Sequence, residues 1–258
     1  MGRGNPNVSG ILPIALENAT KAMIAMAKAP KEYICVMRLH GKVSEEDIKA
    51  VCKEFVGQIY QRPPLKSSVK RVVRIRTIYY LDVLEISGRD VLMRIGCEAG
   101  TYIRKLCHDI GIVLGVGAHM QELRRTRSGV FKEDETLTTL HRLKDAYDTW
   151  VEEGDESELR KVILPVEKAV EETPKITIRD SAVDAICHGA DLAAPGILTI
   201  ESGIKRGDLV ALMTKRGELV ALGTAQKSSE EILNAENGIM VKTRRVIMER
   251  GVYPKMWK

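Results

Sequence analysis

The sequence predicts an α+β protein in which a mixed, curved sheet with flanking helices is followed by a small β-barrel. Residues 90–97 have the composition of a strand, and apolar residues recur at helical spacing from 102 to 114, after a glycine turn. Residues 71–86 are rich in Val, Ile and Tyr, and Ser87-Gly88-Arg89 joins them to 90–97 as in a hairpin. After residue 176, glycine turns recur about every ten residues, which is typical of a small barrel.

The elements that precede this hairpin are predicted from periodicity and from caps. A helix is expected from Ile11, because apolar residues recur at three and four, and Pro30 closes it. Residues 31–39 are expected to form a strand. Ser44 begins a second helix in a pattern like a capping box. The paired prolines in 61–67 remove backbone donors, so this stretch is expected to be a loop.

A boundary is expected in the second half of the chain. A helical pattern over 140–150 is followed by the acidic turn 152–156, and the sequence after Pro174 has few helical signals. We therefore predict two domains, 1–173 and 174–258.

Composition sets broad limits on function. The chain has 258 residues, 44% of them apolar, and 40 Lys and Arg against 35 Asp and Glu, a net charge of +5 that fits nucleic-acid binding or solubility equally well. Its five cysteines lack CxxC spacing, so neither a disulfide framework nor a zinc knuckle is indicated, and a reducing compartment, the cytoplasm, is expected. No membrane span or targeting segment is visible. His108 and His119 lack a third ligand at suitable spacing, so no metal site is predicted.

The corner between the predicted strand 90–97 and its helix carries Tyr102 and Arg104. A guanidinium forks onto carboxylate or phosphate, while a tyrosine face can stack on a base. On these residues alone the structural explanation is favoured, with Tyr102 in the core and Arg104 as a solvated charge.

Four segments together resemble the TruB/dyskerin class of RNA pseudouridine synthases, and among these the archaeal catalytic subunit of H/ACA guide-RNA particles. They are GNPNVSGILPIAL (4–16), KEY (31–33), GTYIRKL (100–106) and GAHMQELRRTRSG (117–129). The phrases HGADLAAPGI and GIKRGDLVAL resemble a PUA domain, an RNA-binding module. The motifs occur in the order of the family, which makes the combination far more specific than any one of them.

The resemblance implies a pseudouridine synthase domain over 1–173 and a PUA domain over 174–258. The implied reaction isomerises uridine to pseudouridine in rRNA, with tRNA as a further target, guided by H/ACA RNA and assisted by small protein subunits of that particle. It needs no cofactor. In the family pattern Tyr33 stacks on the everted uridine, Arg104 pairs with the nucleophilic aspartate, and Tyr102 and Leu123 line the pocket.

One departure from the family lies at the front. The family has Gly-Thr-Leu-Asp-Pro, with Asp as nucleophile, whereas this chain has Gly2-Arg3-Gly4-Asn5-Pro6. An amide resembles a carboxylate in shape but is uncharged and a poor nucleophile, so we expect lost chemistry with RNA binding kept. The alternative is a truncated or mis-joined gene, since strands that precede this motif in the family are expected to be missing.

Two groups of residues are expected to bind RNA. The basic group could equally form a solvated strand edge, and the PUA-like group could simply make barrel turns. The basic group is Lys66, Lys70, Arg71 and Arg74, and the PUA-like group is His188, Gly189, Ala190, Asp191, Lys205, Arg206 and Gly207. Two other functions remain open, a non-catalytic RNA-binding scaffold on the same fold and, less well supported, a PUA-bearing translation factor.

Overall fold

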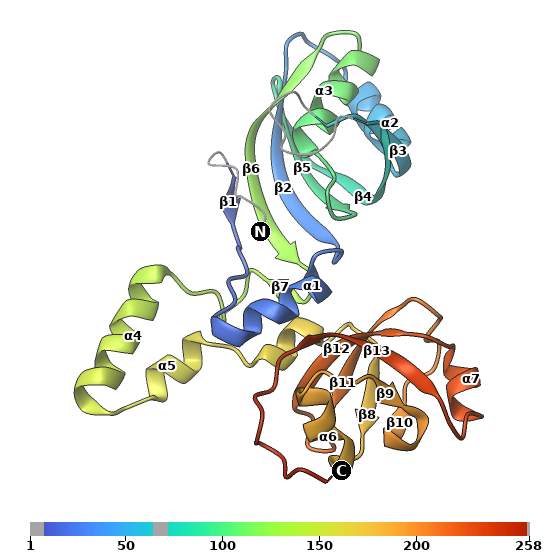
Figure 1. Ribbon diagram of the computed structural model, residues 1–258. Helices are drawn as coiled ribbons and strands as arrows, with labels where there is room; N and C mark the ends of the chain where they lie inside the picture. The colour runs from blue at the N-terminus through green and yellow to red at the C-terminus, as the bar shows by residue number, and fades with distance from the viewer. Residues whose placement is uncertain (1–7, 64–71, 257–258) are drawn as a thin grey trace. The chain divides into compact units, whose positions relative to one another are not determined.

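The computed structural model describes residues 8–63 and 72–256, and its contacts divide the chain into two compact units. Unit 1 comprises Met1–Pro13 and Lys28–Thr139, and unit 2 comprises Ile14–Ala27 and Leu140–Lys258 (Figure 1). The expected domain boundary after residue 173 stays a prediction, because spatial units and inherited domains need not coincide. The α+β architecture predicted from the sequence is confirmed.

Unit 1 is built on one mixed sheet with the order β1-β6-β2-β5-β4-β3, and β7 pairs with β6. Its strands are β1 (Ser9–Gly10), β2 (Lys31–Leu39), β3 (Gly57–Gln61), β4 (Arg74–Ser87), β5 (Asp90–Cys97), β6 (Ala118–Ser128) and β7 (Phe131–Lys132). β2 is antiparallel to both β5 and β6, and β4 and β5 form the predicted hairpin. β1 joins β6 in parallel.

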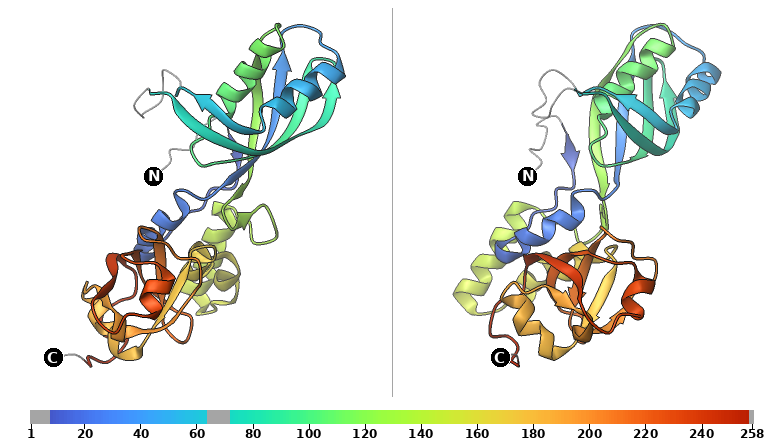
Figure 2. Two further views of the ribbon diagram at one scale, coloured as in Figure 1. Left: turned by 90° about the vertical axis from the view of Figure 1, so that its right-hand side faces the viewer. Right: turned by 45° about the vertical axis from the view of Figure 1, so that its right-hand side comes forward.

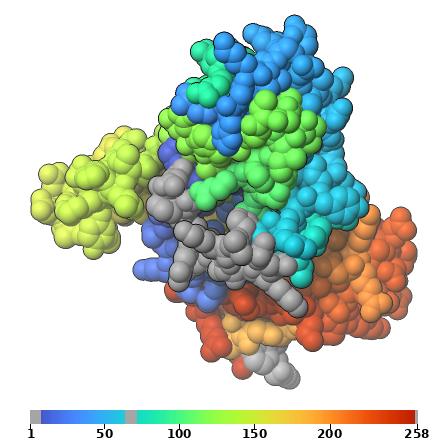
Figure 3. Space-filling view, turned by 90° about the horizontal axis from the view of Figure 1, so that it is seen from above, coloured from blue at the N-terminus to red at the C-terminus, as the bar shows by residue number. Residues whose placement is uncertain are grey.

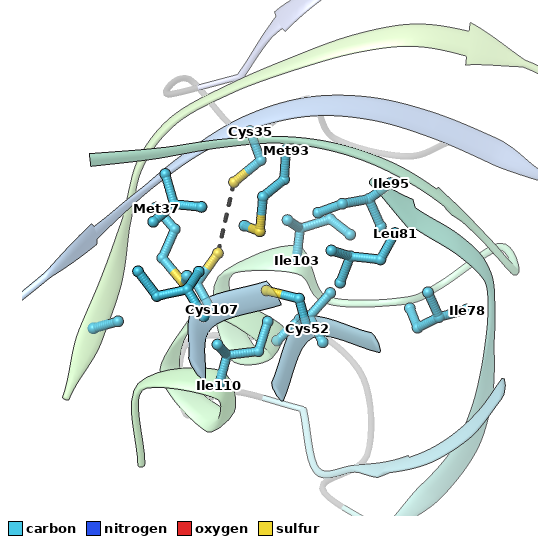
Figure 4. Close-up of a cluster of buried hydrophobic side chains, with 14 of the residues drawn as sticks. Cys35, Met37, Cys52, Ile78, Leu81, Met93, Ile95, Ile103, Cys107 and Ile110 are labelled. Atoms are coloured by element: carbon cyan, nitrogen blue, oxygen red, sulfur yellow. Dashed lines mark hydrogen bonds between the residues drawn. The ribbon is translucent and has the colours of Figure 1, made fainter. Parts of the chain in front are cut away.

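Two helices, α2 (Glu45–Glu54) and α3 (Ile103–Val113), cover one face of this sheet (Figures 1 and 2). The Ser44 hydroxyl accepts a hydrogen bond from the Asp47 N–H at 3.2 Å, so the predicted cap of α2 is confirmed. In α3 the buried side chains are Ile103, Leu106, Cys107 and Ile110. In Figure 4 Cys107 lies beneath Cys35 of β2, with their sulfur atoms 3.6 Å apart. The outer side of α3, green in Figure 3, faces solvent.

Helix α3 approaches β6 unusually closely at Gly111. A methyl group at this position would lie 2.1 Å from the backbone nitrogen of Ala118, which is far inside van der Waals contact. Ala118 is the first residue of β6, and the two elements are joined by a turn with left-handed residues at Gly115 and Gly117. The missing side chain at Gly111 therefore sets how near α3 can lie to the sheet.

Unit 2 contains a small, nearly closed sheet with the order β10-β8-β11-β12-β13-β9. Its strands are β8 (Lys175–Ile178), β9 (Leu192–Ala193), β10 (Ile197–Ile200), β11 (Leu209–Met213), β12 (Leu219–Ala225) and β13 (Ile239–Val246). Its helical segments are η1 (Glu17–Ala22), α1 (Met23–Met26), α4 (Leu140–Glu153), α5 (Ser157–Val162), η2 (Val166–Val170), α6 (Asp180–Cys187), η3 (Ala194–Gly196) and α7 (Ser229–Leu233). Among residues 8–63 and 72–256, every helix falls short of the length and apolarity that a bilayer crossing requires.

The predicted helix from Ile11 is wrong in its first half. Helical structure begins only at Glu17, as the 3₁₀ turn η1, and the four residues of α1 follow it. Pro13 favours extended backbone in the residue before it, and Glu17 itself has a left-handed φ of 45°. Ala22 is buried against Val170 within unit 2, so this stretch is held by packing. The predicted 61–67 loop also needs correction, because Gln61 is the last residue of β3.

Gly111→Ala is expected to destabilise the protein by about 1–3 kcal/mol, because the added methyl group overlaps backbone that cannot swing away. The gain in helix propensity, about 1 kcal/mol, is too small to offset this. Urea unfolding followed by circular dichroism measures the change. Ile112→Ala is the matched control, since Ile112 is 59% exposed. Equal stability of Gly111→Ala and wild type would contradict the close packing.

Candidate active site

A tight corner joins β5 to α3. Gly100 has a left-handed φ of 83°, and the Thr101 N–H and hydroxyl both donate to the Glu98 carbonyl, at 3.2 and 2.7 Å. Tyr102 is the N-cap residue, with extended backbone, and its carbonyl accepts the N–H groups of Lys105 and Leu106 at 3.0 Å each. The sequence prediction of a glycine turn that releases a strand into a helix is confirmed.

Gln61 holds this corner from β3. Its side-chain Oε1 accepts the Tyr102 N–H at 2.9 Å, and its Nε2 donates to the Tyr102 carbonyl at 3.2 Å. Gln61 is only 2% exposed. The sequence analysis gave this residue no role, because its partner is 41 residues away in the chain and the adjacent prolines indicated a loop.

The corner is also tied to β4 through Glu98. The Glu98 carboxylate accepts the Thr77 N–H at 3.1 Å and forms an ion pair with Arg76 at 3.3 Å. The Arg76 guanidinium lies beside Gly100, within 3.5 Å of where a Cβ would be. Two neighbouring strands therefore fix the backbone that leads into α3.

Arg104 lies on the first turn of α3 with its side chain exposed. The first turn of this helix has no acidic residue, so a cation lies at the positive end of the helix dipole. Among the described residues Arg104 has no ion-pair partner. This arrangement costs helix stability but gives a positive potential that suits an anionic group.

Tyr33 and Leu123 lie on the sheet face that α3 covers. Tyr33 lies on the same face of β2 as the buried Cys35 and Met37, because residues two apart in a strand share a face. Leu123 of β6 lies opposite Cys35. Both side chains are partly buried and pack against the core of unit 1. Burial, and less strongly Cys97, raises the pKa of Tyr33, which the Arg125 guanidinium only partly offsets. The Tyr33 phenol is therefore neutral and half covered.

The start of the described chain is anchored beside these residues. In the parallel pairing of β1 with β6, Ser9 lies opposite Arg124 and Gly10 opposite Arg125, the residue that also pairs with Tyr33. The Ile11 N–H donates to the Arg125 carbonyl at 2.9 Å, and the Arg125 Nε donates to the Ile11 carbonyl at 2.8 Å. A methyl group on Gly10 would lie 2.1 Å from the Arg125 carbonyl oxygen, so only glycine fits.

The opposite face of the sheet braces the KEY motif. Glu32 accepts hydrogen bonds from the Tyr80 hydroxyl at 2.5 Å and the Thr126 hydroxyl at 2.8 Å, which links β2 to β4 and β6. Burial pushes the pKa of Glu32 up, but these hydrogen bonds and the charges of Arg127 and Arg94 outweigh it, so the pKa lies below its ordinary value. Burial and the Glu32 acceptor raise the pKa of Tyr80 to about 12.

Several predicted site residues fall outside the described part of the chain. These are Asn5, Lys66, Lys70 and Arg71. Arg74 is described, as the first residue of β4, partly buried opposite Gln61. Two arginines of the RRTR run have structural contacts. Arg124 donates to the Glu133 carboxylate, and Arg125 donates to the Ile11 carbonyl.

In unit 2 the predicted residues 188–191 form one exposed turn after α6. Gly189 has a left-handed φ of 92°, and the Ala190 N–H donates to the Ala185 carbonyl at 3.0 Å. The Asp191 carboxylate accepts the Thr243 N–H of β13 at 2.8 Å. His188 Nδ1 lies 2.8 Å from the Asp184 carbonyl oxygen.

The second predicted group, Lys205, Arg206 and Gly207, lies in a turn that precedes β11. Gly207 has a left-handed φ of 95°, and the Lys205 N–H donates to the Asp208 carboxylate at 2.8 Å. The side chains of Lys205 and Arg206 are exposed. Strand β13 adds three exposed cations that the sequence analysis missed, although the KTRR run could have indicated them. They are Lys242, Arg244 and Arg245.

No group of three or more potential metal ligands occurs among the described residues. His119 instead lies against His40, with Nδ1 and Nε2 2.9 Å apart, and His108 is an exposed residue of α3. All five cysteines are free and buried.

Comparison with known proteins assigns the chain by its sequence. The model described as "TruB family pseudouridylate synthase (N terminal domain)" matches residues 1–103. The models "tRNA pseudouridylate synthase B C-terminal domain" and "PUA domain" match residues 104–171 and 174–247. A relative from Methanopyrus kandleri, "Probable tRNA pseudouridine synthase B", is 62% identical over 256 residues, which are 99% of this chain and 75% of the relative. The chain belongs to the TruB family of pseudouridine synthases.

A second TruB-family relative, from Thermococcus kodakarensis and with the same name, is 60% identical over 257 residues, covering 100% of this chain and 76% of the relative. Two solved structures are also similar. A "Cbf5-Nop10-Gar1 Complex" gives a TM-score of 0.94 at 60% identity, covering 97% of this chain and 76% of the matched chain. An "H/ACA RNP bound to a substrate RNA containing 2'-deoxyuridine" gives 0.92 at 57% identity, covering 99% and 78%.

Glu32→Gln is expected to lower the thermal unfolding midpoint at pH 7, because the charged carboxylate is the better acceptor for Tyr80 and Thr126. Since the folded pKa of Glu32 is depressed, this stabilisation is present above its ordinary pKa of 4.5 and is lost as the pH falls through the folded value. The difference from wild type should therefore shrink at pH 3. Glu46→Gln, an exposed position of α2, is the control. A difference that grows with acid would refute the brace.

Proposed function

We propose that this TruB-family chain recognises uridine in RNA as the catalytic subunit of an H/ACA-guided pseudouridine synthase. The observation that best supports this proposal is the arrangement of unit 1. Tyr33 and Leu123 lie on the sheet face that α3 covers, and Tyr102 and the exposed Arg104 lie at the start of α3. Family membership and the similarity to H/ACA structures support the same function.

The reaction breaks the bond between uracil N1 and the sugar, and rejoins the base through C5. An enzyme reaches that bond only when the uridine leaves its stack, and an everted base is held by an aromatic face. Tyr33 takes this role in the proposal, since it is neutral and half covered. Tyr102 and Leu123 border the base, and Arg104 is placed to hold the attacking carboxylate of the family motif.

Asn5 occupies the position of that acidic group in the family motif. A carboxamide can accept a hydrogen bond from Arg104, but it carries no charge and does not act as a nucleophile under these conditions. The proposal is therefore that the chain as written binds RNA and forms little or no product. This same residue favours a second function, a non-catalytic RNA-binding scaffold.

The proposed targets are rRNA and, as the names of the relatives suggest, tRNA. The proposed partners are the guide RNA and small proteins such as those in the Cbf5-Nop10-Gar1 complex. The proposed domains are a catalytic domain, 1–173, and a PUA domain, 174–258. The proposed compartment is the cytoplasm, which five free cysteines support.

RNA contact by unit 2 is proposed at two groups of exposed turn residues, 188–191 and 205–207. Their glycine conformations expose backbone groups, and Lys205 and Arg206 supply charge. Phosphate binding by such cations releases counterions and so depends on salt. The basic group at 66–74 is proposed for the same purpose in unit 1.

Asn5→Asp is expected to create pseudouridine synthase activity, because it restores a carboxylate nucleophile. With an H/ACA guide and a matched substrate RNA, product formation should exceed that of the chain as written by about three orders of magnitude or more, the scale of removing a covalent nucleophile. Release of tritium from C5-labelled uridine measures it.

Asn5→Ser is the control, since it changes the same position without adding a carboxylate. Turnover by the chain as written would contradict the impairment. Absence of product from Asn5→Asp, with RNA bound, would favour the scaffold.

The double variant Lys205→Ala with Arg206→Ala is expected to weaken RNA binding and to lower the slope of log K against log salt by about 1–2, one for each phosphate group that the variant no longer neutralises. Fluorescence anisotropy at several salt concentrations measures it. Lys161→Ala with Lys168→Ala is the control, because both are lysines of unit 2 that form ion pairs, with side chains 60% and 42% exposed. An unchanged slope would exclude phosphate binding at this turn.

A further inference from the structure

Gln61 is a buried polar residue whose side chain makes both of its hydrogen bonds within the described residues to the backbone of Tyr102. The carboxamide accepts from the Tyr102 N–H and donates to the Tyr102 carbonyl, at 2.9 and 3.2 Å. This reproduces with a side chain the pair of bonds that two residues exchange in an antiparallel sheet. Burying an amide at 2% exposure is unfavourable unless both of its ends are satisfied, as they are here.

The residue that Gln61 holds, Tyr102, is the N-cap of α3. The N–H of an N-cap residue receives no bond from the helix that follows it, so it needs a partner from elsewhere. The Tyr102 backbone angles, φ −95° and ψ 98°, set the direction in which the first turn leaves the corner. Arg104 is two residues later on that turn. A shift of the Tyr102 peptide therefore moves the guanidinium.

Other side chains cannot replace the carboxamide at this place. A methionine has similar length but would leave the Tyr102 N–H without its acceptor. A glutamate keeps the acceptor for the Tyr102 N–H. In place of the amide group that donates to the Tyr102 carbonyl, it has a second, negatively charged oxygen. Only when it is protonated does glutamate again offer one acceptor and one donor. This difference separates a positioning role from simple space filling.

We propose that Gln61 is a positioning residue for the pseudouridine synthase reaction, which fixes Tyr102 and Arg104 against the substrate through the Tyr102 peptide. The proposal rests on the proposed function. Gln61 acts through the backbone of another residue and does not itself touch the base. Its effect is on the rate of the chemical step rather than on RNA affinity, because the RNA contacts proposed for unit 2 involve neither Gln61 nor Tyr102.

The test compares three variants made in the Asn5→Asp chain, with guide and substrate RNA present. They are Gln61→Glu, Gln61→Met and, as matched control, Gln58→Ala, an exposed glutamine of the same strand. At pH 8, Gln61→Glu and Gln61→Met should lower the single-turnover rate by about 10- to 100-fold, the scale of a misplacement of about 1 Å. RNA affinity should stay within about twofold.

Lowering the pH should rescue one variant only. Burial raises the pKa of a carboxyl at this position, so Gln61→Glu should regain most of the parent rate towards pH 6, as the protonated acid restores both hydrogen bonds. Gln61→Met should stay slow at every pH, and Gln58→Ala should follow the parent. If Gln61→Glu and Gln61→Met share one pH profile, or if they lose thermal stability while keeping the rate, the proposal is overturned.

A second readout separates this proposal from the proposed function. In the chain as written, the Tyr102 amide should exchange slowly, because its N–H donates to Gln61. At one fixed pH, Gln61→Met, which removes the acceptor, should make this exchange faster, whereas Gln58→Ala should leave it unchanged. The Arg104 Nε–H NMR signal should shift on addition of a uridine-containing RNA in wild type and not in Gln61→Met. If Asn5→Asp gives no product, the proposed function fails, and an Arg104 shift that Gln61→Met leaves unchanged overturns the positioning role independently.

Discussion

The packing of α3 on the sheet is the constraint on which the candidate site depends. Cys107 lies against Cys35, and Gly111 allows the helix to approach the start of β6 at backbone distance. This contact fixes the helix axis relative to β2 and β6, the strands of Tyr33 and Leu123. The two hydrogen bonds from Gln61 to Tyr102 then fix the start of the same helix. A corner between a strand and a helix is positioned less accurately when it has only its own backbone contacts. Here hydrogen bonds and an ion pair from β3 and β4 hold it in place.

The basic residues divide into those that hold the fold and those left open for a ligand. Arg124, Arg125 and Arg76 each bond to groups within unit 1. Arg104 has no ion-pair partner among the described residues, and Lys205 and Arg206 extend from an exposed turn. An exposed ion pair is worth only about 0–1 kcal/mol, so the paired cations add little stability, but they are less available to phosphate. Net charge alone could not have distinguished the two classes.

The sequence predicts most of the fold, because local signals and tertiary packing agree there. The β4–β5 hairpin, the Ser44 cap and the glycine corner at 100 all follow from residues close in the chain. The prediction fails at Ile11, where helical periodicity is present but Pro13 and the packing of Ala22 override it. It misses Gln61 because the role of that residue depends on a contact 41 positions away. The assigned roles of Tyr33, Tyr102, Arg104 and Leu123 stay predictions.

Asn5 changes the electrostatics of the proposed site as well as its chemistry. In the family pattern the nucleophilic carboxylate neutralises the arginine at the start of α3. With an amide in that place, the charge of Arg104 is opposed neither by an acid in the first turn nor by an ion-pair partner within the described residues. The cation is then free to attract the phosphates of a nucleotide, and the helix dipole adds to this attraction. Under the proposed function, asparagine in place of the aspartate of the family motif removes the nucleophile and leaves the charge of Arg104 available to an anion. The expected loss of turnover and the expected retention of RNA then have the same physical cause.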